Sequence, residues 1–164
     1  MSMLDIITYG HETLGRKAAP VAEFGPELGP FIAEMFEALK RGNGIGLAAP
    51  QVDRSIRLFV TDLEGDKPRV FINPEIVLTS QETVDIEEGC LSLPGLYQKV
   101  QRPEAVRIQA YNEKGRPFTV EADGMLARLI LHENDHLDGI LFVDRLNALK
   151  RERALAQYRR LLRK

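Results

Sequence analysis

The sequence is poor in the residues that mark secreted and membrane proteins. Its 1 cysteine, Cys90, excludes an intrachain disulfide, and this suits a reducing compartment such as the cytoplasm. No apolar run approaches the roughly 20 residues that cross a bilayer. The first ten residues, MSMLDIITYG, lack the basic and apolar regions of a secretory signal, and they are not Arg- and Ser-rich like a transit peptide. We therefore expect a cytoplasmic protein without a targeting segment or a membrane span.

What remains is the composition of an ordinary soluble protein, with 44% hydrophobic and 28% charged residues. A length of 164 residues suits one domain, over residues 1–164, with one substantial core. The net charge of -2 is unevenly distributed. The basic segment, residues 150–164, holds seven basic side chains and one acidic, whereas residues 1–149 hold 15 basic and 23 acidic. Such a segment indicates a polyanionic partner or, alternatively, a solvated helix with one packed face.

Hydrophobic spacing predicts both helices and strands. Residues 25–44 have the apolar stripe of a helix that ends at Gly42 or Gly44. Segments rich in β-branched and aromatic residues predict strands at 56–62, 69–73, 105–111 and 116–122, the last two joined by a turn at 112–115.

Two more helices complete the predicted elements. One covers 123–139, with Asp123 as candidate N-cap and Gly139 as the stop, and the other begins near Asn147 and forms the basic C-terminal helix 147–164. This order predicts an α+β fold with mostly antiparallel strands and with helices near both ends of the chain.

Histidine is also scarce, and two of the 3 histidines lie together in LILHENDHLDG, residues 129–139. On a helix, His132 and His136 share one face and can direct two imidazoles at one point. Glu133 is offset by about 100° and can take a proton from a metal-bound water. A surface helix with two solvated histidines is the alternative. The preceding turn is apolar (Met125, Leu126, Leu129, Ile130), which predicts a buried helix and favours a cation between the histidines.

A catalytic metal centre usually needs a third protein ligand and one open position. No histidine follows His136, and His11 lies near the N-terminus. The remaining soft ligand is Cys90 in EEGCLSLPG, although a lone cysteine is also a common small core residue. With Cys90 the ligands would be Cys-His-His, a set that suits zinc, iron(II), nickel or cobalt. The predicted architecture is then strands packed around a central metal-binding helix.

At this point the chain resembles the peptide deformylase family. That family has three motifs of the forms G-x-G-L-A-A-x-Q, E-G-C-L-S and H-E-x-D-H. This sequence has GIGLAAPQ (44–51), EGCLS (88–92) and HENDH (132–136), complete and in that order. The resemblance covers nearly the whole chain. One departure is Leu131, where the family most often has Gln.

The resemblance implies a hydrolase that removes the formyl group from the N-formylmethionine that begins new bacterial proteins. It places the metal on Cys90, His132 and His136. Glu133 would be the general acid/base, and the Gln51 side chain and the Leu91 backbone N–H would stabilise the oxyanion. The family natively uses Fe²⁺, which Zn²⁺, Ni²⁺ or Co²⁺ can replace.

The substrate would be an extended N-formylmethionyl nascent peptide. Gly44 and Gly46 would let the backbone come close to the peptide. Ile45 and Gly46 would offer it N–H and C=O groups, as to an added strand, whereas a plain loop between helix and strand is the alternative. Ile45, Ile86, Met125 and Leu129 are candidate walls for the methionine side chain, although each residue type is more often simply core. Shorter bacterial members are thought to dock on the ribosome through the basic C-terminal helix. We expect a monomer.

Several alternatives stay open at this level. Glu88, Arg102 and Asp135 are candidate partners of the metal ligands, or else solvated surface charges. A zincin-type peptidase would share H-E-x-x-H but take a third ligand other than Cys90. A structural metal or RNA-binding module would need a fourth protein ligand and a closed site, and the sequence offers no good candidate for that ligand.

Overall fold

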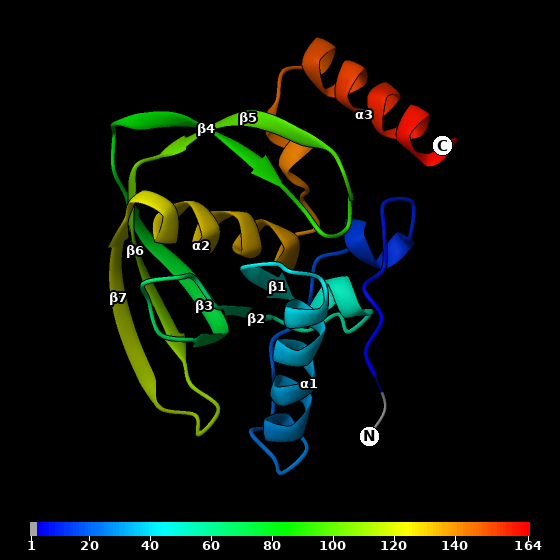
Figure 1. Ribbon diagram of the computed structural model, residues 1–164. Helices are drawn as coiled ribbons and strands as arrows, with labels where there is room; N and C mark the ends of the chain where they lie inside the picture. Colours follow the sequence, from blue (N-terminus) through cyan, green and yellow to red (C-terminus); the bar gives the residue numbers. More distant parts are fainter. Residues whose placement is uncertain (1–2) are drawn as a thin grey trace.

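The structure is a computed structural model that describes residues 3–164, and it has the predicted α+β architecture (Figure 1). Its strands are β1 (Gly46–Ala48), β2 (Leu58–Thr61), β3 (Arg69–Thr79), β4 (Thr83–Gly89), β5 (Tyr97–Pro103), β6 (Ala105–Tyr111) and β7 (Pro117–Asp123). Its α-helices are α1 (Leu28–Arg41), α2 (Gly124–Leu137) and α3 (Ala148–Leu162). Short 3₁₀ helices cover Glu12–Gly15, Ala49–Val52 and Phe142–Arg145.

Five strands form one antiparallel sheet in the order β1-β2-β3-β6-β7. The hairpin β6–β7 is the one that the sequence predicts, and Asn112 stabilises its turn by accepting hydrogen bonds from the backbone N–H groups of Lys114 and Arg116. Strand β3 extends beyond the predicted 69–73. Two register irregularities in its pairing with β6 let it continue past Pro74.

Helix α2 lies between this sheet and the hairpin β4–β5 (Figure 1). Ala127, Ile130 and Leu137 of α2 share an apolar cluster with Phe59 of β2 and Phe71 of β3. The rings of Phe59 and Phe71 stack with centroids 4.7 Å apart. Fully burying a side chain such as Ile stabilises a fold by about 1.5–3 kcal/mol, so this cluster fixes the helix on the sheet. The prediction of a central helix is thereby confirmed.

The hairpin β4–β5 was not among the predicted elements. Its seven register pairs run from Thr83↔Pro103 to Gly89↔Tyr97. The strands look polar because two of their buried side chains, Glu88 and Arg102, are charged and satisfy each other. Hydrophobic periodicity therefore gives no signal for them.

The helix boundaries follow the sequence with small differences. Helix α1 ends directly before Gly42, as predicted. Asp123 occupies the N-cap position of α2 but its side chain makes no capping hydrogen bond, and α2 ends at Leu137, two residues before Gly139. Asn147 caps α3 by accepting from the N–H of Lys150.

Helix α3 buries Ala154, Leu155 and Tyr158, whereas Leu149 and Leu162, which extend its apolar stripe in the sequence, are exposed. Its buried face packs against Leu93 and Leu96, in the loop that follows β4. No helix in residues 3–164 is both long enough and apolar enough to cross a membrane.

Candidate metal centre and active site

Three soft ligand atoms converge where the hairpin β4–β5 meets α2. One atom from each of Cys90, His132 and His136 lies within 4.8 Å of the others, and Cys90 Sγ is 3.4 Å from His136 Nε2. Cys90 follows the last residue of β4, and its loop is fixed by the buried side chains of Leu93 and Leu96. The predicted triad is therefore assembled from two segments more than 40 residues apart.

The orientation of His132 is set by a carboxylate. Its Nδ1 lies 2.8 Å from Glu88 Oε1, which leaves Nε2 for a metal. Arg102 binds both oxygens of Glu88 and also reaches Asp135, so all three candidate partners of the ligands are buried and in contact. Arg128 donates to Glu88 Oε2 at 2.6 Å. The alternative that these groups are solvated surface charges is wrong.

The electrostatics of this cluster favour a cation. Burial by itself would raise the pKa of Glu88, but hydrogen bonds from His132 and Arg102 outweigh it and hold that pKa at about 2. Burial disfavours the charged form of His132, yet Cys90 and Glu88 raise its pKa well above its usual value. The same partners that attract a proton here would attract a metal ion. Burial lowers the pKa of His136 and keeps it as the neutral imidazole that metals bind.

Glu133 stands beside the three ligands, with its carboxyl group buried. It is only 2% exposed, and burial raises its pKa to about 7, well above 4.5. Its Oε1 and the Nδ1 of His136 are buried polar atoms without a hydrogen-bond partner in residues 3–164. Unpaired buried polar atoms are uncommon and call for a ligand, water or ion. The donor set, its charge and these atoms together fit a metal centre with room for a reactant.

Gln51 reaches the centre from the 3₁₀ helix Ala49–Val52. Its Nε2 is 3.5 Å from Cys90 Sγ and 3.1 Å from Ser92 Oγ, and its Oε1 accepts from the N–H of Ala48 at 3.0 Å. Leu91, next to Cys90, lines the same cavity. The Gln51 amide is thus brought to the metal ligands, and Leu91 lies at the cavity beside them.

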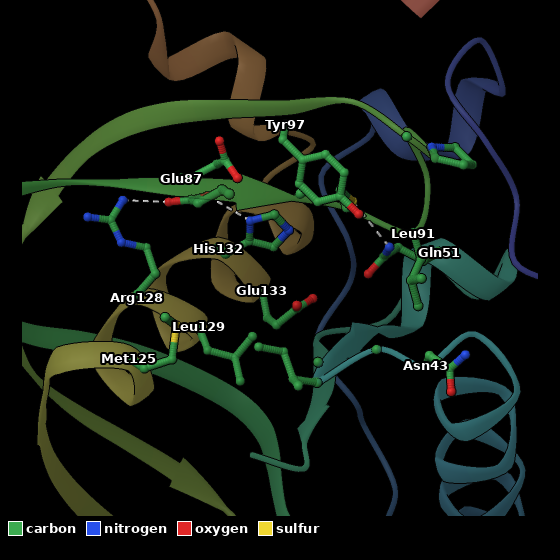
Figure 2. A pocket seen from close by; sticks show the side chains of 18 residues that line it. Asn43, Gln51, Glu87, Leu91, Tyr97, Met125, Arg128, Leu129, His132 and Glu133 are labelled. Atoms are coloured by element: carbon green, nitrogen blue, oxygen red, sulfur yellow. Dashed lines mark hydrogen bonds and ion pairs between the residues drawn. The ribbon is translucent and has the colours of Figure 1, made fainter. Parts of the chain in front are cut away.

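A cavity of about 490 Å³ opens over this centre (Figure 2). Gly44, Ile45, Gly46, Met125 and Leu129 line it, as the sequence predicts.

Ile86 is not among the residues that line the cavity, so its assignment to the methionine pocket is not supported. It pairs with Val100 farther along the hairpin, away from the end of β4 that carries Cys90. Glu87 and Glu88 line the cavity in its place.

Strand β1 is the edge of the five-stranded sheet. The C=O of Ile45 accepts from the N–H of Asp62, so it belongs to the ladder with β2 and does not face a peptide. In an antiparallel pair the next residue directs its groups the other way. Gly46 therefore turns its N–H and C=O to the open side. Ala48 faces the same way, but its N–H is bound by Gln51. Ile45 contributes its exposed side chain.

The absence of a side chain at Gly46 is required by its neighbours. A Cβ there would lie 2.6 Å from Glu133 Oε2 and 2.7 Å from a methyl of Leu129. A larger residue would displace the carboxylate or close the cavity between β1 and α2.

Some residues of the site were not singled out from the sequence. Tyr97 and Asn43 lie at the mouth of the cavity, and Arg128 lines its side toward the hairpin (Figure 2). The sequence does carry a pattern that indicates Arg128, because this residue precedes His132 by four positions and so lies on the same face of the helix. Tyr97 and Asn43 lie on loops and a strand end that carry no comparable pattern.

The chain matches the family model described as polypeptide deformylase over residues 3–152. The chain belongs to the peptide deformylase family. The peptide deformylase of Chromobacterium violaceum is 51% identical over 155 residues, covering 93% of this chain and 92% of that protein. The peptide deformylase of Acinetobacter baumannii is 47% identical over 165 residues, covering 99% and 94%.

Solved structures of the family have the same fold. The peptide deformylase from Thermus thermophilus is similar with a TM-score of 0.91 and 42% identity, covering 97% of this chain and 94% of that one. A peptide deformylase from Synechococcus elongatus in complex with actinonin gives a TM-score of 0.89 and 44% identity, covering 94% and 86%. Family membership removes the zincin peptidase and the structural or RNA-binding metal module from consideration.

Proposed function

We propose that the protein removes the formyl group from N-formylmethionyl peptides, with one catalytic metal ion held by Cys90, His132 and His136 in a single catalytic domain. The observation that carries this proposal is the convergence of three metal-ligand atoms, within 4.8 Å of one another, beside a buried and unpaired Glu133 oxygen. Three protein ligands leave one position for a reactant, as catalytic sites require.

The chemistry divides between the ion and the side chains. A bound metal ion supplies Lewis acidity, which makes water a usable nucleophile near neutral pH. Glu133 takes the proton of that water and later gives it to the leaving amine. A pKa of about 7 suits a group that must both accept and return a proton. Gln51 Nε2 and the backbone N–H of Leu91 donate to the oxyanion that develops on the formyl oxygen when water attacks the formyl carbon. The C–N bond then breaks, and formate and the free amine leave.

The peptide binds across the open edge of β1. Gly46 offers its N–H and C=O to an extended chain, which explains how many different sequences can be accepted. The side chains of Ile45, Met125 and Leu129 provide the apolar contact for the first residue, methionine. At Gly44 the protein backbone passes between α1 and the side chain of Leu91. A Cβ at position 44 would lie only 2.8 Å from that side chain.

The reaction is tested with formyl-Met-Ala-Ser and acetyl-Met-Ala-Ser as paired substrates. Anaerobically prepared protein should release the free amine from the formyl peptide and not from the acetyl peptide, because only hydrogen fits beside the reacting carbon in a tight site. Metal content is read on the same sample. Protein that holds about one Fe²⁺, Ni²⁺ or Co²⁺ ion per chain and leaves the formyl peptide intact would refute the proposal.

We further propose Fe²⁺ as the native ion, with Zn²⁺, Ni²⁺ and Co²⁺ as replacements. A thiolate and two imidazoles bind all four ions, which is why the ligand set does not choose between them. Protein stripped with a chelator should be inactive and should recover on anaerobic loading with Fe²⁺, Ni²⁺ or Co²⁺. Loss of the Fe²⁺ form in air, with the Ni²⁺ form unaffected, is the expected signature of the iron enzyme.

The basic C-terminal helix α3 is proposed to dock the monomer on the ribosome in the cytoplasm. Arg159, Arg160 and Arg163 are exposed, while the packed face of α3 is formed by other residues. Replacing these three by Gln should weaken ribosome binding and reduce its salt dependence, since each phosphate contact contributes to that dependence. The matched control replaces the exposed Lys17, Lys99 and Lys114 by Gln. Equal binding by both triple variants would exclude α3 as the docking element.

A further inference from the structure

We propose that Ser92 is a positioning residue that aims one N–H of the Gln51 amide at the reacting oxygen. This inference rests on the proposed function, in which Gln51 is an oxyanion donor. Ser92 does not line the cavity. It lies fully buried behind Gln51, so it would act through that side chain and not through the substrate.

The hydroxyl of Ser92 has only one role available toward Gln51. Its single hydrogen is donated to the C=O of Ile7 at 2.7 Å. The lone pairs of Oγ are thereby presented to Gln51, whose Nε2 lies 3.1 Å away. A hydroxyl has one O–H donor and two acceptor lone pairs, so Ser92 must accept from the amide.

The other end of the amide is fixed as well. Gln51 Oε1 accepts from the N–H of Ala48 at 3.0 Å. A flipped amide would set its oxygen against the Ser92 lone pairs and its NH₂ group against the Ala48 N–H. Both contacts would be repulsive, and both groups are buried, where an unsatisfied polar atom costs about 1–3 kcal/mol. The arrangement therefore selects one of the two amide orientations.

Fixing the first N–H of Gln51 also fixes the direction of its second N–H. A planar NH₂ group carries two hydrogens that point in different directions. Because Ser92 holds one, the other is directed to the side of Cys90, whose Sγ lies 3.5 Å from Nε2. That is the side on which the metal ligands meet and on which the oxyanion would develop.

Residues near the N-terminus hold Ser92 in turn. The N–H of Ile7 donates to the C=O of Gln51, and the N–H of Tyr9 donates to the C=O of Ser92, both at 2.8 Å. With the Ser92 hydroxyl on the Ile7 carbonyl, three hydrogen bonds tie this segment to Gln51 and Ser92. Pre-organised donors stabilise a transition state best because they need no reorientation.

The test is a double-mutant cycle with Ser92→Ala, Gln51→Leu and the combined variant in Ni²⁺-loaded protein. Removing an oxyanion donor costs about 10²–10³ in kcat, and a misplaced donor up to about 10². We expect Ser92→Ala to lower kcat by about 10-fold or more with KM little changed. We expect the combined variant to be no slower than Gln51→Leu alone, because Ser92 acts only through Gln51.

A matched control separates positioning from packing. Ser80 also donates its hydroxyl to a carbonyl and accepts a backbone N–H, but it lies at the turn between β3 and β4. Ser80→Ala should leave kcat unchanged, and Ser92→Thr, which keeps the hydroxyl, should restore much of the activity lost in Ser92→Ala.

The outcomes are distinguishable. The role of Ser92 would be overturned if the loss of kcat in the combined variant equals the product of the two single losses. It would also be overturned if Ser92→Ala is as active as Ser80→Ala. A fully active Gln51→Leu enzyme would instead refute the proposed role of Gln51.

Unmodified Zn²⁺-loaded protein gives a readout that does not depend on the folding of any variant. In its NMR spectrum one of the two Gln51 Nε2 protons should show an NOE to the β-protons of Ser92 and the other should not. Absence of this contact would also overturn the proposal.

Discussion

The two sides of α2 bury different chemistry. Toward the sheet it presents Ala127, Ile130 and Leu137, which pack on aromatic and aliphatic side chains of β2, β3 and β6. We call this the sheet face. Toward the hairpin β4–β5 it presents the charged or titratable side chains Arg128, His132, Asp135 and His136, with Glu133 beside them. We call this the hairpin face.

The difference shows how one helix can be both a core element and a catalytic one. Apolar burial on the sheet face is favourable without any partner. Buried charges on the hairpin face are costly unless each is paired, and there Glu88 and Arg102 provide the pairing. The sheet face should therefore contribute to stability without affecting reactivity, and reactivity should depend on the hairpin face.

The largest effect is expected from Glu133→Gln. Loss of the proposed proton carrier should lower kcat by about 10²–10⁴ while the metal stays bound. Because Glu133 is buried with an unpaired oxygen, the free energy of unfolding should stay the same or rise. Kinetics, metal analysis and denaturant unfolding on one preparation check this. Loss of metal or of stability in this variant would show that Glu133 also contributes to metal binding or to folding, contrary to the role assigned to it.

Glu88→Gln should affect metal binding and acid stability together. Outer partners of ligating histidines typically contribute about 10–100-fold in metal affinity. A folded pKa of about 2 against 4.5 means that ionised Glu88 stabilises the fold fully above pH 4.5. That contribution, about 3 kcal/mol, is lost as the pH falls from 4.5 toward 2.

For Glu88, the free energy of unfolding of the native protein and of Glu88→Gln is measured between about pH 2 and pH 7. This range covers the protonation of the carboxylate in both the folded and the unfolded state. The stability difference between the native protein and Glu88→Gln should be large at neutral pH and shrink as the pH approaches 2. A difference independent of pH would show that the carboxylate is not held ionised by His132 and Arg102.

Ile130→Ala probes the sheet face. Truncating a fully buried isoleucine should destabilise the fold by about 2–5 kcal/mol through lost apolar contact and a residual cavity. At temperatures where the variant is folded, kcat should equal that of the native protein. Thermal unfolding, with kinetics measured well below the unfolding transition, provides the comparison. A variant of normal stability but reduced kcat would reverse the roles assigned to the faces.

The smallest effect is expected from Arg107→Gln. Arg107 pairs with Glu121 across β6 and β7, and both side chains are exposed. Exposed ion pairs contribute about 0–1 kcal/mol, in contrast to the buried pair of Arg102 and Glu88. Unfolding in low and high salt should show a difference of that size that disappears with salt. A loss of several kcal/mol would mean that exposure does not separate the two classes of ion pair.

The sequence predicts those parts of the fold in which side-chain type follows local periodicity. Helices α1 and α2 and the hairpin β6–β7 have clear apolar patterns and were confirmed within a few residues. The hairpin β4–β5 was missed because Glu88 and Arg102 are buried in spite of their charge, and only their partners on α2 explain this. Strand β1 is too short to carry a pattern.

The residues of the site were likewise predicted from spacing only where they are close in sequence. His132, Glu133 and His136 are close in sequence, and their spacing on a helix predicts their geometry. Cys90 and Gln51 were placed by motif resemblance, because their proximity depends on the tertiary fold. The structure does not support the assignment of Ile86 to the methionine pocket or of the Ile45 carbonyl to the peptide, and the cause is physical. Strand register and the direction of hydrogen bonds decide which groups face a cavity, and neither can be read from one strand alone.

The most direct test of this account replaces the one ligand that the hairpin supplies. In Cys90→Ala, prepared anaerobically and loaded with Ni²⁺, metal content and deformylation of formyl-Met-Ala-Ser are measured on the same sample. Bound metal should fall far below one ion per chain and activity should be lost. The free energy of unfolding, measured on chelator-treated Cys90→Ala and chelator-treated native protein, should remain similar. A Cys90→Ala protein that keeps its metal and its activity would show that the hairpin does not complete the metal centre on α2.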